Sequence, residues 1–477
     1  VNSVRKHLRT FVIYDTIDRR KETILMKKIP ERSEIAQKDK WAIEDLYPSA
    51  EAWQADLKKL QALGAEMTGF AGRIHTSAAA LLEYMRLNEQ VSILFDSLGN
   101  YAYRKNDEDT RVAESQALLG QMMKAGVELG EQTSFEVPEL LSISDETMEQ
   151  FYKDEPALEL YRRHFDEIRR KRPHVLSESE EKLLAAAGEM ASTPHRVFSL
   201  FSDADMKFPD ALDSEGKPHQ ITQGTYVACL KSDDRTLRQN AFDSYYGVYD
   251  NYKNSLAGML SAQVKQLEFF AKARRYETAQ QAALDNTEVP VSVYSNLIEA
   301  VHRNFDKLHR YTRLRKRLMG VDELHFYDLY TTLVPDADVS IPYEQAKQTI
   351  SEALTCLGEE YGKLLRQGFD NRWIDVYENV GKRSGAYSAG ALVHPFVLLN
   401  YTGTLDSQFT LAHEMGHALH SYLSNHTQPT IYQDYVIFVA EVASTCNEAL
   451  LMQHLLKQTT DKRQRAYLIN YFLEQFR

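Results

Sequence analysis

The sequence Thr410-Leu-Ala-His413-Glu414-Met-Gly-His417-Ala-Leu-His420 carries two histidines four positions apart. Residues at i and i+4 lie on one face of an α-helix, so His413 and His417 can hold one metal ion between them. Glu414 lies beside that face, where a carboxylate can reach a water molecule on the metal. This His-Glu-x-x-His pattern predicts a helix that binds a single Zn²⁺ ion at a catalytic site.

The alternative interpretation is a pair of surface histidines on an ordinary helix. Gly416 argues against it, because glycine inside a helix costs about 1 kcal/mol relative to alanine and predicts close approach by another part of the chain. Most other residues of this helix are apolar, which predicts that it is buried, and buried histidines need partners. These apolar residues are Phe409, Leu411, Ala412, Ala418 and Leu419.

A catalytic zinc site needs three protein ligands and one open position. The metzincin pattern would place glycine at position 420 and a third histidine at position 423. This chain has His420 and Leu423 there, so the sequence excludes that class. His420 is predicted to support the site or to face the substrate, because a fourth protein ligand would close the open position.

Three acidic residues, seven positions apart, mark one face of a helix that we predict at 431–456. They are Asp434, Glu441 and Glu448. Apolar neighbours on both sides of Glu441 predict that its carboxylate is buried, which is costly without an ionic partner. Glu441 is therefore the predicted third ligand, with Glu448 as the alternative. Glu448 and Asp434 are also predicted to accept hydrogen bonds from the free ring N–H groups of the ligand histidines.

The rest of the pattern predicts a mainly α-helical protein. Helical periodicity runs through residues 40–200, and we assign 26–200 to an N-terminal helical domain and 201–477 to a catalytic domain. A β-hairpin is predicted at 203–222. Three further strands are predicted at 373–402, directly before the His-Glu-x-x-His helix, and a sheet edge beside a metal could pair with an extended peptide.

Charge and cysteine content exclude several classes of protein. The net charge of −12, from 56 basic and 68 acidic residues, argues against a nucleic-acid partner. No apolar run is long enough to span a bilayer, so no membrane association is predicted. The three cysteines are far apart, which indicates neither a disulfide framework nor a thiolate metal site and favours a reducing cytoplasm. Residues 1–25 are basic and lack the features of a signal peptide, and we predict that they are a non-native or disordered leader before Met26.

From about residue 30 onward the chain resembles bacterial oligoendopeptidase F, of the thimet-oligopeptidase-like zinc metallopeptidases. The stretches that carry the resemblance begin at Gly381 (GKRSGAYS), His394 (HPFVLLNYTGT), His413 (HEMGHALH) and Phe438 (FVAEVAST). The resemblance implies a mostly helical, two-lobed bacterial enzyme with a deep channel and a small sheet beside the active-site helix. It implies cleavage of short oligopeptides, and we favour a monomer.

The resemblance also implies roles for particular residues. His413, His417 and Glu441 would bind zinc, and Glu414 would be the general base that takes a proton from water and passes it to the leaving amine. The strand at 394–401, which begins with His394, would line the channel and pair with the substrate, with Tyr387 nearby.

The family continues beyond the position of Arg477, with a histidine and several tyrosines that stabilise the oxyanion. We therefore expect the catalytic domain at 201–477 to be truncated. The alternative function is a zinc-containing peptide-binding protein without turnover. A zinc deaminase is disfavoured, because the sequence lacks the H-x-E and P-C-x-x-C patterns.

Overall fold

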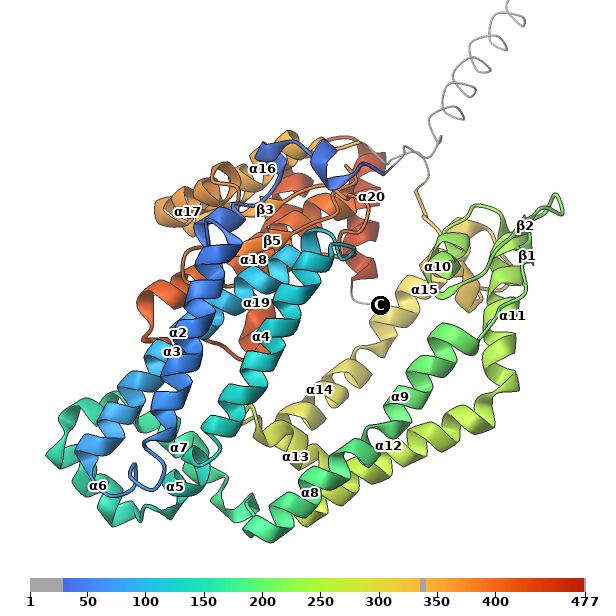
Figure 1. The fold of residues 1–477 in the computed structure, drawn as a ribbon. Helices are drawn as coiled ribbons and strands as arrows, with labels where there is room; N and C mark the ends of the chain where they lie inside the picture. The colour runs from blue at the N-terminus through green and yellow to red at the C-terminus, as the bar shows by residue number, and fades with distance from the viewer. Residues whose placement is uncertain (1–28, 335–339, 476–477) are drawn as a thin grey trace, which may run out of the picture. The chain divides into compact units, whose positions relative to one another are not determined.

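The computed structural model describes residues 29–334 and 340–475, and these residues form a mainly helical protein with a few short strands (Figure 1). The prediction of a mainly α-helical fold with a small sheet is confirmed. The predicted leader at 1–25 lies outside the described residues. Among the described residues, no helix has the length and apolar character needed to cross a membrane. The monomeric state and the cytoplasmic location stay predictions.

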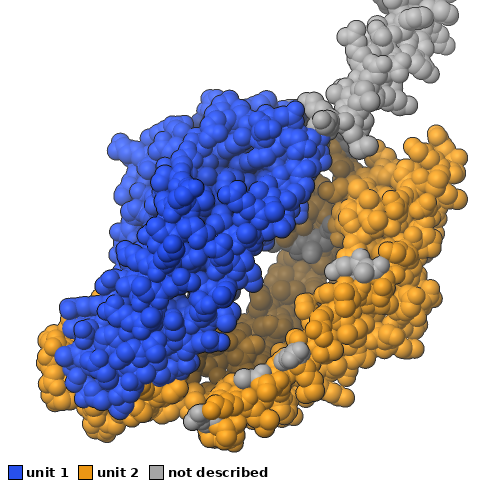
Figure 2. All heavy atoms as spheres, viewed as in Figure 1, with its two compact units in different colours: residues 1–135, 339–451 blue, residues 136–338, 452–477 orange. Residues whose placement is uncertain are grey.

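Two compact units make up the chain, and each is built from segments distant in sequence (Figure 2). The first contains residues 1–135 and 339–451, and the second contains residues 136–338 and 452–477. The predicted domain border near residue 200 falls inside the second unit, and the assignment of domains stays a prediction.

The first unit carries the His-Glu-x-x-His motif. Its helices are α2 (Ala50–Thr68), α3 (Ala78–Glu108), α4 (Ala113–Gln132), α16 (Tyr343–Ala353), α17 (Glu359–Asp370), α18 (Leu405–Thr427) and α19 (Ile437–Gln458), the last of which continues into the second unit. Its strands are β3 (Ile374–Asp375), β4 (Tyr387–Ala389) and β5 (Phe396–Leu398). Ser49 accepts a hydrogen bond from the backbone N–H of Ala52 and so caps α2.

The second unit contains only short strands and many helices. Its helices are α5 (Glu136–Ser142), α6 (Asp145–Asp154), α7 (Arg162–Arg170), α8 (Glu178–Ala191), α9 (Thr193–Leu200), α10 (Gln223–Leu230), α11 (Arg235–Asn251), α12 (Lys253–Ala273), α13 (Ala279–Asp285), α14 (Val291–Arg303), α15 (Phe305–Met319) and α20 (Lys462–Glu474). Strands β1 (Ala211–Leu212) and β2 (Pro218–His219) pair antiparallel, so the predicted hairpin is present.

Two local predictions need correction in this region. Residues Phe201–Asp205 form a π-helical turn at the end of α9, so the first strand of the hairpin begins at Ala211 and not at 203. The helical periodicity predicted through residues 40–200 is interrupted after Asp154, because Pro156 cannot continue an α-helix and begins a 3₁₀ segment instead.

The sheet of the first unit has the strand order β3-β5-β4. Strand β5 pairs parallel with β3 and antiparallel with β4, and all three of its side chains are fully buried. The prediction that the strand at 394–401 pairs with substrate is therefore wrong, because β5 uses both of its edges inside the sheet. The edge strand beside α18 is β4.

Candidate metal centre

Helix α18 presents the motif on one side and packs its apolar side into the core. The hydroxyl oxygen of Thr404 accepts a hydrogen bond from the backbone N–H of Ser407, so this threonine, a residue type favoured at helix N-termini, caps the helix. Leu411, Ala412 and Met415 are fully buried, whereas His413 and His417 are half-buried. The apolar pattern thus fixes the rotation of the helix and leaves both imidazoles accessible to a ligand.

His413, His417 and Glu441 converge on one point. Their candidate ligand atoms all lie within 4.8 Å of one another. The two Nε2 atoms are 3.1 Å apart, and the Glu441 Oε2 atom lies 3.4 Å from His413 Nε2 and 3.5 Å from His417 Nε2. Two imidazoles and one carboxylate are a typical protein donor set for catalytic zinc, so these residues fit the ion that the sequence predicts.

Gly416 explains how α19 comes close enough to supply Glu441. A Cβ atom at Gly416 would lie 2.7 Å from the Cα of Ser444 and 2.8 Å from the carbonyl oxygen of Ala443. The close approach that the sequence predicts at this glycine is thus made by the backbone of α19. Across the same contact, the buried Asn447 side chain donates a hydrogen bond of 3.0 Å to the carbonyl oxygen of Ala412.

Glu441 is more exposed than the sequence suggests. Its side chain is 52% exposed, whereas that of Glu448 is 24% exposed. The prediction of a buried Glu441 is wrong because Val442, which follows it, is 62% exposed, although Ala440 before it is buried. The hydroxyl of Ser444 donates a hydrogen bond of 2.9 Å to Glu441 Oε2 and holds the carboxylate in position.

Both histidine rings also have hydrogen-bond partners outside the group of three candidate ligands. His413 Nδ1 lies 2.5 Å from Glu448 Oε1, and this hydrogen bond, with further support from the nearby carboxylates, raises the pKa of His413. The ring of His417 has a hydrogen bond with the backbone of Ala440. Burial, and then the charge of His413, lower the pKa of His417. The structure thus places Glu448 where a partner for a ligand histidine is predicted.

Glu414 lies beside the ligands but is itself 7% exposed. Burial raises the pKa of its carboxyl group to about 7, with Glu441 and Glu448 adding to the effect and His413 opposing it. A carboxyl group with a pKa close to neutral pH can both take up and release a proton.

The other predicted site residues have different surroundings. His394 is buried between Trp373 and Phe396, where its Nδ1 lies 2.8 Å from the carbonyl oxygen of Pro395. Its Nε2 atom lies 3.2 Å from Asp45 Oδ2, so both ring nitrogens have partners, and the role of His394 in supporting the site or facing the substrate stays a prediction. The hydroxyl of Tyr387, on β4, donates a hydrogen bond of 2.7 Å to Asp107.

His420 and Asp434 occupy the segment next to the metal centre. The ring of His420 stacks on Tyr435 at 3.7 Å, and its Nδ1 atom is buried with no hydrogen-bond partner among the described residues. Asp434 precedes α19, which begins at Ile437 and not near 431, so it does not share a helical face with Glu441. Residues 433–436 lie outside any helix, where Tyr435 bonds Ser421 at 2.7 Å and the carbonyl of Gln433 accepts from Ser424 at 2.6 Å.

Sequence reasoning missed Ser444, Asn447 and Tyr435. Helical spacing could have indicated Ser444, because a residue at i+3 lies beside Glu441 on the same face. Tyr435 gives no such signal, since its partner His420 belongs to another helix.

The chain matches known proteins over most of its length. Residues 228–477 match the profile of Peptidase family M3, and residues 139–208 match that of Oligopeptidase F. The chain is 42% identical to oligopeptidase PepF of Bacillus subtilis (strain 168), over 94% of this chain and 67% of the relative. It is 37% identical to group B oligopeptidase PepB of Streptococcus agalactiae, over 94% of this chain and 74% of the relative.

Solved structures show the same fold. A putative peptidase from Chlamydophila abortus superposes with a TM-score of 0.84 at 34% identity, covering 94% of this chain and 76% of the other. Oligoendopeptidase-F from Enterococcus faecium gives a TM-score of 0.63 at 33% identity, covering 89% and 71%. The fold and the site define a metalloendopeptidase. The chain belongs to peptidase family M3, among the relatives named oligoendopeptidase F, and the resemblance noted in the sequence is confirmed.

Proposed function

We propose that this protein is a zinc-dependent endopeptidase that hydrolyses peptide bonds in oligopeptides. His413, His417 and Glu441 bind one Zn²⁺ ion, and Glu414 is the general base. The observation that carries the proposal is the convergence of three ligand atoms, from two helices, within 4.8 Å. The names of the relatives, which include oligopeptidase PepF, support oligopeptides as the class of substrate.

The reaction depends on where the protein holds protons. Zinc bound by the three residues would polarise the scissile carbonyl and lower the pKa of a water molecule to about 7. Glu414 would take a proton from the attacking water as its oxygen bonds to the scissile carbonyl carbon, and would return that proton to the amine nitrogen as the C–N bond breaks. Burial of Glu414 raises the pKa of its carboxyl group in the protein without metal, and a raised pKa favours uptake of the proton.

Strand β4 is the part of the sheet that suits a peptide backbone. Val397 and Leu399 donate their backbone N–H groups to β3, so by strand alternation Phe396 and Leu398 pair with β4. This register directs the backbone groups of Ser388, which lies opposite Val397, toward the free edge of β4. We propose that this edge, in place of β5, binds the substrate backbone.

Strand β4 also runs beside the metal centre. The residues before it, Gly385 and Ala386, line a recess together with Thr410. The residue after it, Gly390, lies against Ser421, with an ideal Cβ 3.0 Å from the Ser421 Cβ atom. Thr410 and Ser421 flank the two histidines along α18, so a peptide on the β4 edge would pass the metal.

The experiment combines a zinc assay with cleavage of an internally quenched peptide. Glu414→Gln is expected to keep one zinc per chain and to lose at least about 100-fold in kcat, because it removes the base and leaves the ligands. Glu360→Gln, on the exposed surface of α17, is the control and should behave as the unmodified protein. Normal turnover by Glu414→Gln would contradict the assignment.

A chelator tests the metal itself. Removal of zinc should abolish cleavage, and stoichiometric zinc should restore it. Zinc and peptide binding without any cleavage by the unmodified chain would contradict the proposal and favour the peptide-binding alternative. For Glu441→Ala we expect loss of zinc, and full occupancy in that variant would move the third ligand to Glu448.

A further inference from the structure

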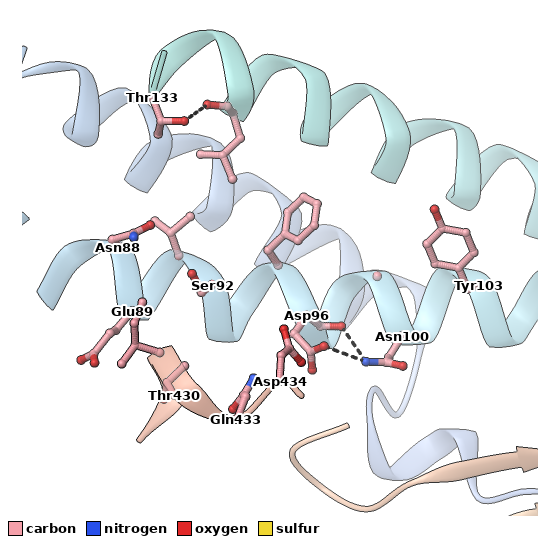
Figure 3. A pocket seen from close by; sticks show the side chains of 15 residues that line it. Asn88, Glu89, Ser92, Asp96, Asn100, Tyr103, Thr133, Thr430, Gln433 and Asp434 are labelled. Atoms are coloured by element: carbon pink, nitrogen blue, oxygen red, sulfur yellow. Dashed lines mark hydrogen bonds between the residues drawn. The ribbon is translucent and has the colours of Figure 1, made fainter. Parts of the chain in front are cut away.

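A pocket of about 520 Å³ lies in the first unit, between α3, α4 and the segment that leads into α19 (Figure 3). Carboxylates and amides form one wall, among them Asp96, Asn100 and Asp434. The side chains of Phe95 and Leu129 form an apolar wall of the same pocket. A pocket of this size exceeds what a bare metal ion needs and can hold a side chain or the end of a peptide.

The polar wall is negatively charged. Asp96 and Asp434 lie next to one another, one from α3 and one from the segment before α19 (Figure 3). Within the described part of the chain no lysine or arginine forms an ion pair with either carboxylate. Arg104, whose charge opposes the rise in the pKa of Asp96, donates to Asn100 at 3.1 Å and lies 4.9 Å from the centre of the Tyr387 ring.

The negative charge of the Asp96 carboxylate is only partly balanced by its surroundings. Burial, together with the charge of Asp434, raises the pKa of Asp96 to about 6, although Asn100 donates a hydrogen bond of 3.0 Å to its carboxylate. A cationic group that entered the pocket would relieve both the repulsion between the two carboxylates and the incomplete solvation of Asp96.

The pocket adjoins the edge strand through Asn100. The same side-chain amide that contacts Asp96 also donates a hydrogen bond of 3.2 Å to the carbonyl oxygen of Gly390, directly after β4. On the other side, Asp434 precedes Tyr435, whose ring stacks on His420 of the motif helix. The pocket therefore lies at the Gly390 end of the strand that passes the metal centre.

We propose that this pocket is a subsite for a positively charged amino group of the peptide substrate. The carboxylates of Asp96 and Asp434 bind the ammonium or guanidinium group, and the apolar wall at Phe95 contacts the attached carbon chain. The group is either the amino terminus of the peptide or a lysine or arginine side chain beyond the Gly390 end of β4. This inference rests on the proposed function, because only that function makes the bound peptide a substrate.

The test measures binding and needs no turnover. Fluorescently labelled heptapeptides are titrated into the Glu414→Gln variant. One position of the peptide at a time carries either lysine or norleucine, which is its uncharged match. Each peptide is made with a free and with an acetylated amino terminus. At one or more positions lysine should bind about tenfold more tightly than norleucine, or the free terminus about tenfold more tightly than the acetylated one. Which of the two differences appears identifies the source of the amino group.

The pocket variants locate the effect. Asp96→Asn and, separately, Asp434→Asn should each abolish the preference for the charged peptide and leave the affinity for the uncharged, acetylated peptide unchanged. Glu83→Gln, which removes one exposed charge from the same helix α3, should retain the preference. Equal binding of charged and uncharged peptides by the parent protein would overturn the proposal, as would a preference that survives in both pocket variants. Failure of cleavage with the charge preference intact would instead count against the proposed function alone.

Discussion

Gly416 and Ser444 join the two helices that form the metal centre. An ideal Cβ at Gly416 would stand 2.7 Å from the Cα of Ser444, a separation that real Cβ atoms essentially never show. The atoms in conflict belong to backbone, so no side-chain rotation could relieve them. The distance between α18 and α19, and with it the position of Glu441 relative to His413, depends on the absence of a side chain at this glycine.

Gly416→Ala is therefore expected to push α19 away and to weaken zinc binding by about tenfold or more. Cleavage should fall with zinc occupancy and recover partly at high zinc concentration. Competition with a chromogenic chelator measures the affinity, and thermal unfolding of the zinc-free protein reports any loss of packing. Unchanged zinc affinity would show that the helices can separate without moving Glu441.

Gly120→Ala is the matched control for this substitution. Gly120 lies in α4, and nothing lies within 4 Å of an ideal Cβ there. Alanine should raise stability by about 0.5–1 kcal/mol, because glycine is the poorer helix former, and should leave zinc affinity unchanged.

Ser444 also positions the third ligand directly. Its hydroxyl donates to Glu441 Oε2 at 2.9 Å, whereas the neighbouring Thr445 hydroxyl bonds only the backbone carbonyl of Glu441. Ser444→Ala should lower zinc affinity by about tenfold, since the freed carboxylate can rotate away from the histidines. Thr445→Ala should have little effect on zinc. Equal affinities in the two variants would mean that the hydroxyl of Ser444 does not orient Glu441.

The sequence was sufficient for the parts of this site that depend on local spacing. The i, i+4 histidines, the cap at Thr404 and the bare helix surface at Gly416 all follow from residues within one helix. The strand order β3-β5-β4 did not follow, because it depends on pairing between residues more than twenty positions apart. Consequently the sequence assigned substrate pairing to β5 when the free edge belongs to β4.

Burial was the second property that local reasoning could not determine. The apolar neighbours Ala440, Val442 and Ala443 predicted a buried Glu441, yet Val442 is exposed and only Ala440 is buried. Likewise the seven-residue spacing from Asp434 to Glu441 suggested one helical face, but contacts of Tyr435 with α18 delay the start of α19. Both errors arise from contacts with other segments, which override helical periodicity at the end of a helix.

Substitution of Glu448 tests whether this residue is a zinc ligand or only supports the ligand His413. Its carboxylate lies 2.5 Å from His413 Nδ1, on the side of the ring opposite the converging atoms. Glu448→Ala should reduce zinc affinity by about 10- to 100-fold without changing the stoichiometry at saturating zinc. Glu441→Ala should instead fail to bind zinc under the same conditions. If Glu448→Ala failed to bind zinc and Glu441→Ala only bound it more weakly, Glu448 would be the ligand and Glu441 the supporting residue.

The last prediction concerns a group of charged side chains at strand β3. Asp375 of β3 is fully buried, with Arg32 at 2.5 Å and Lys382 at 2.7 Å from its carboxylate oxygens. Lys382 also donates to the backbone carbonyls of Tyr377 and Leu399, so one ion group connects β3, β5 and the turn between β3 and β4. Removal of the carboxylate would leave the buried ammonium of Lys382 without its counter-ion.

Asp375→Asn should destabilise the protein by about 3–5 kcal/mol at pH 7, as judged from urea unfolding.

Burial alone would raise the pKa of Asp375, but the hydrogen bond from Arg32 and the charge of Lys382 outweigh it, so the pKa in the folded protein lies below its usual value. A carboxyl group with a lowered folded-state pKa stabilises the fold fully above its unfolded value of about 3.9, and this stabilisation is lost as the pH falls through the folded-state pKa. The difference between variant and parent should therefore stay constant from pH 8 to 5 and shrink only below about pH 4. Glu31→Gln, which removes one of the two acidic partners of the exposed Arg111, should leave the unfolding midpoint unchanged across this range. A difference that disappears already at pH 6 would show that the pKa of Asp375 is raised and that the ion group does not hold the carboxylate charged.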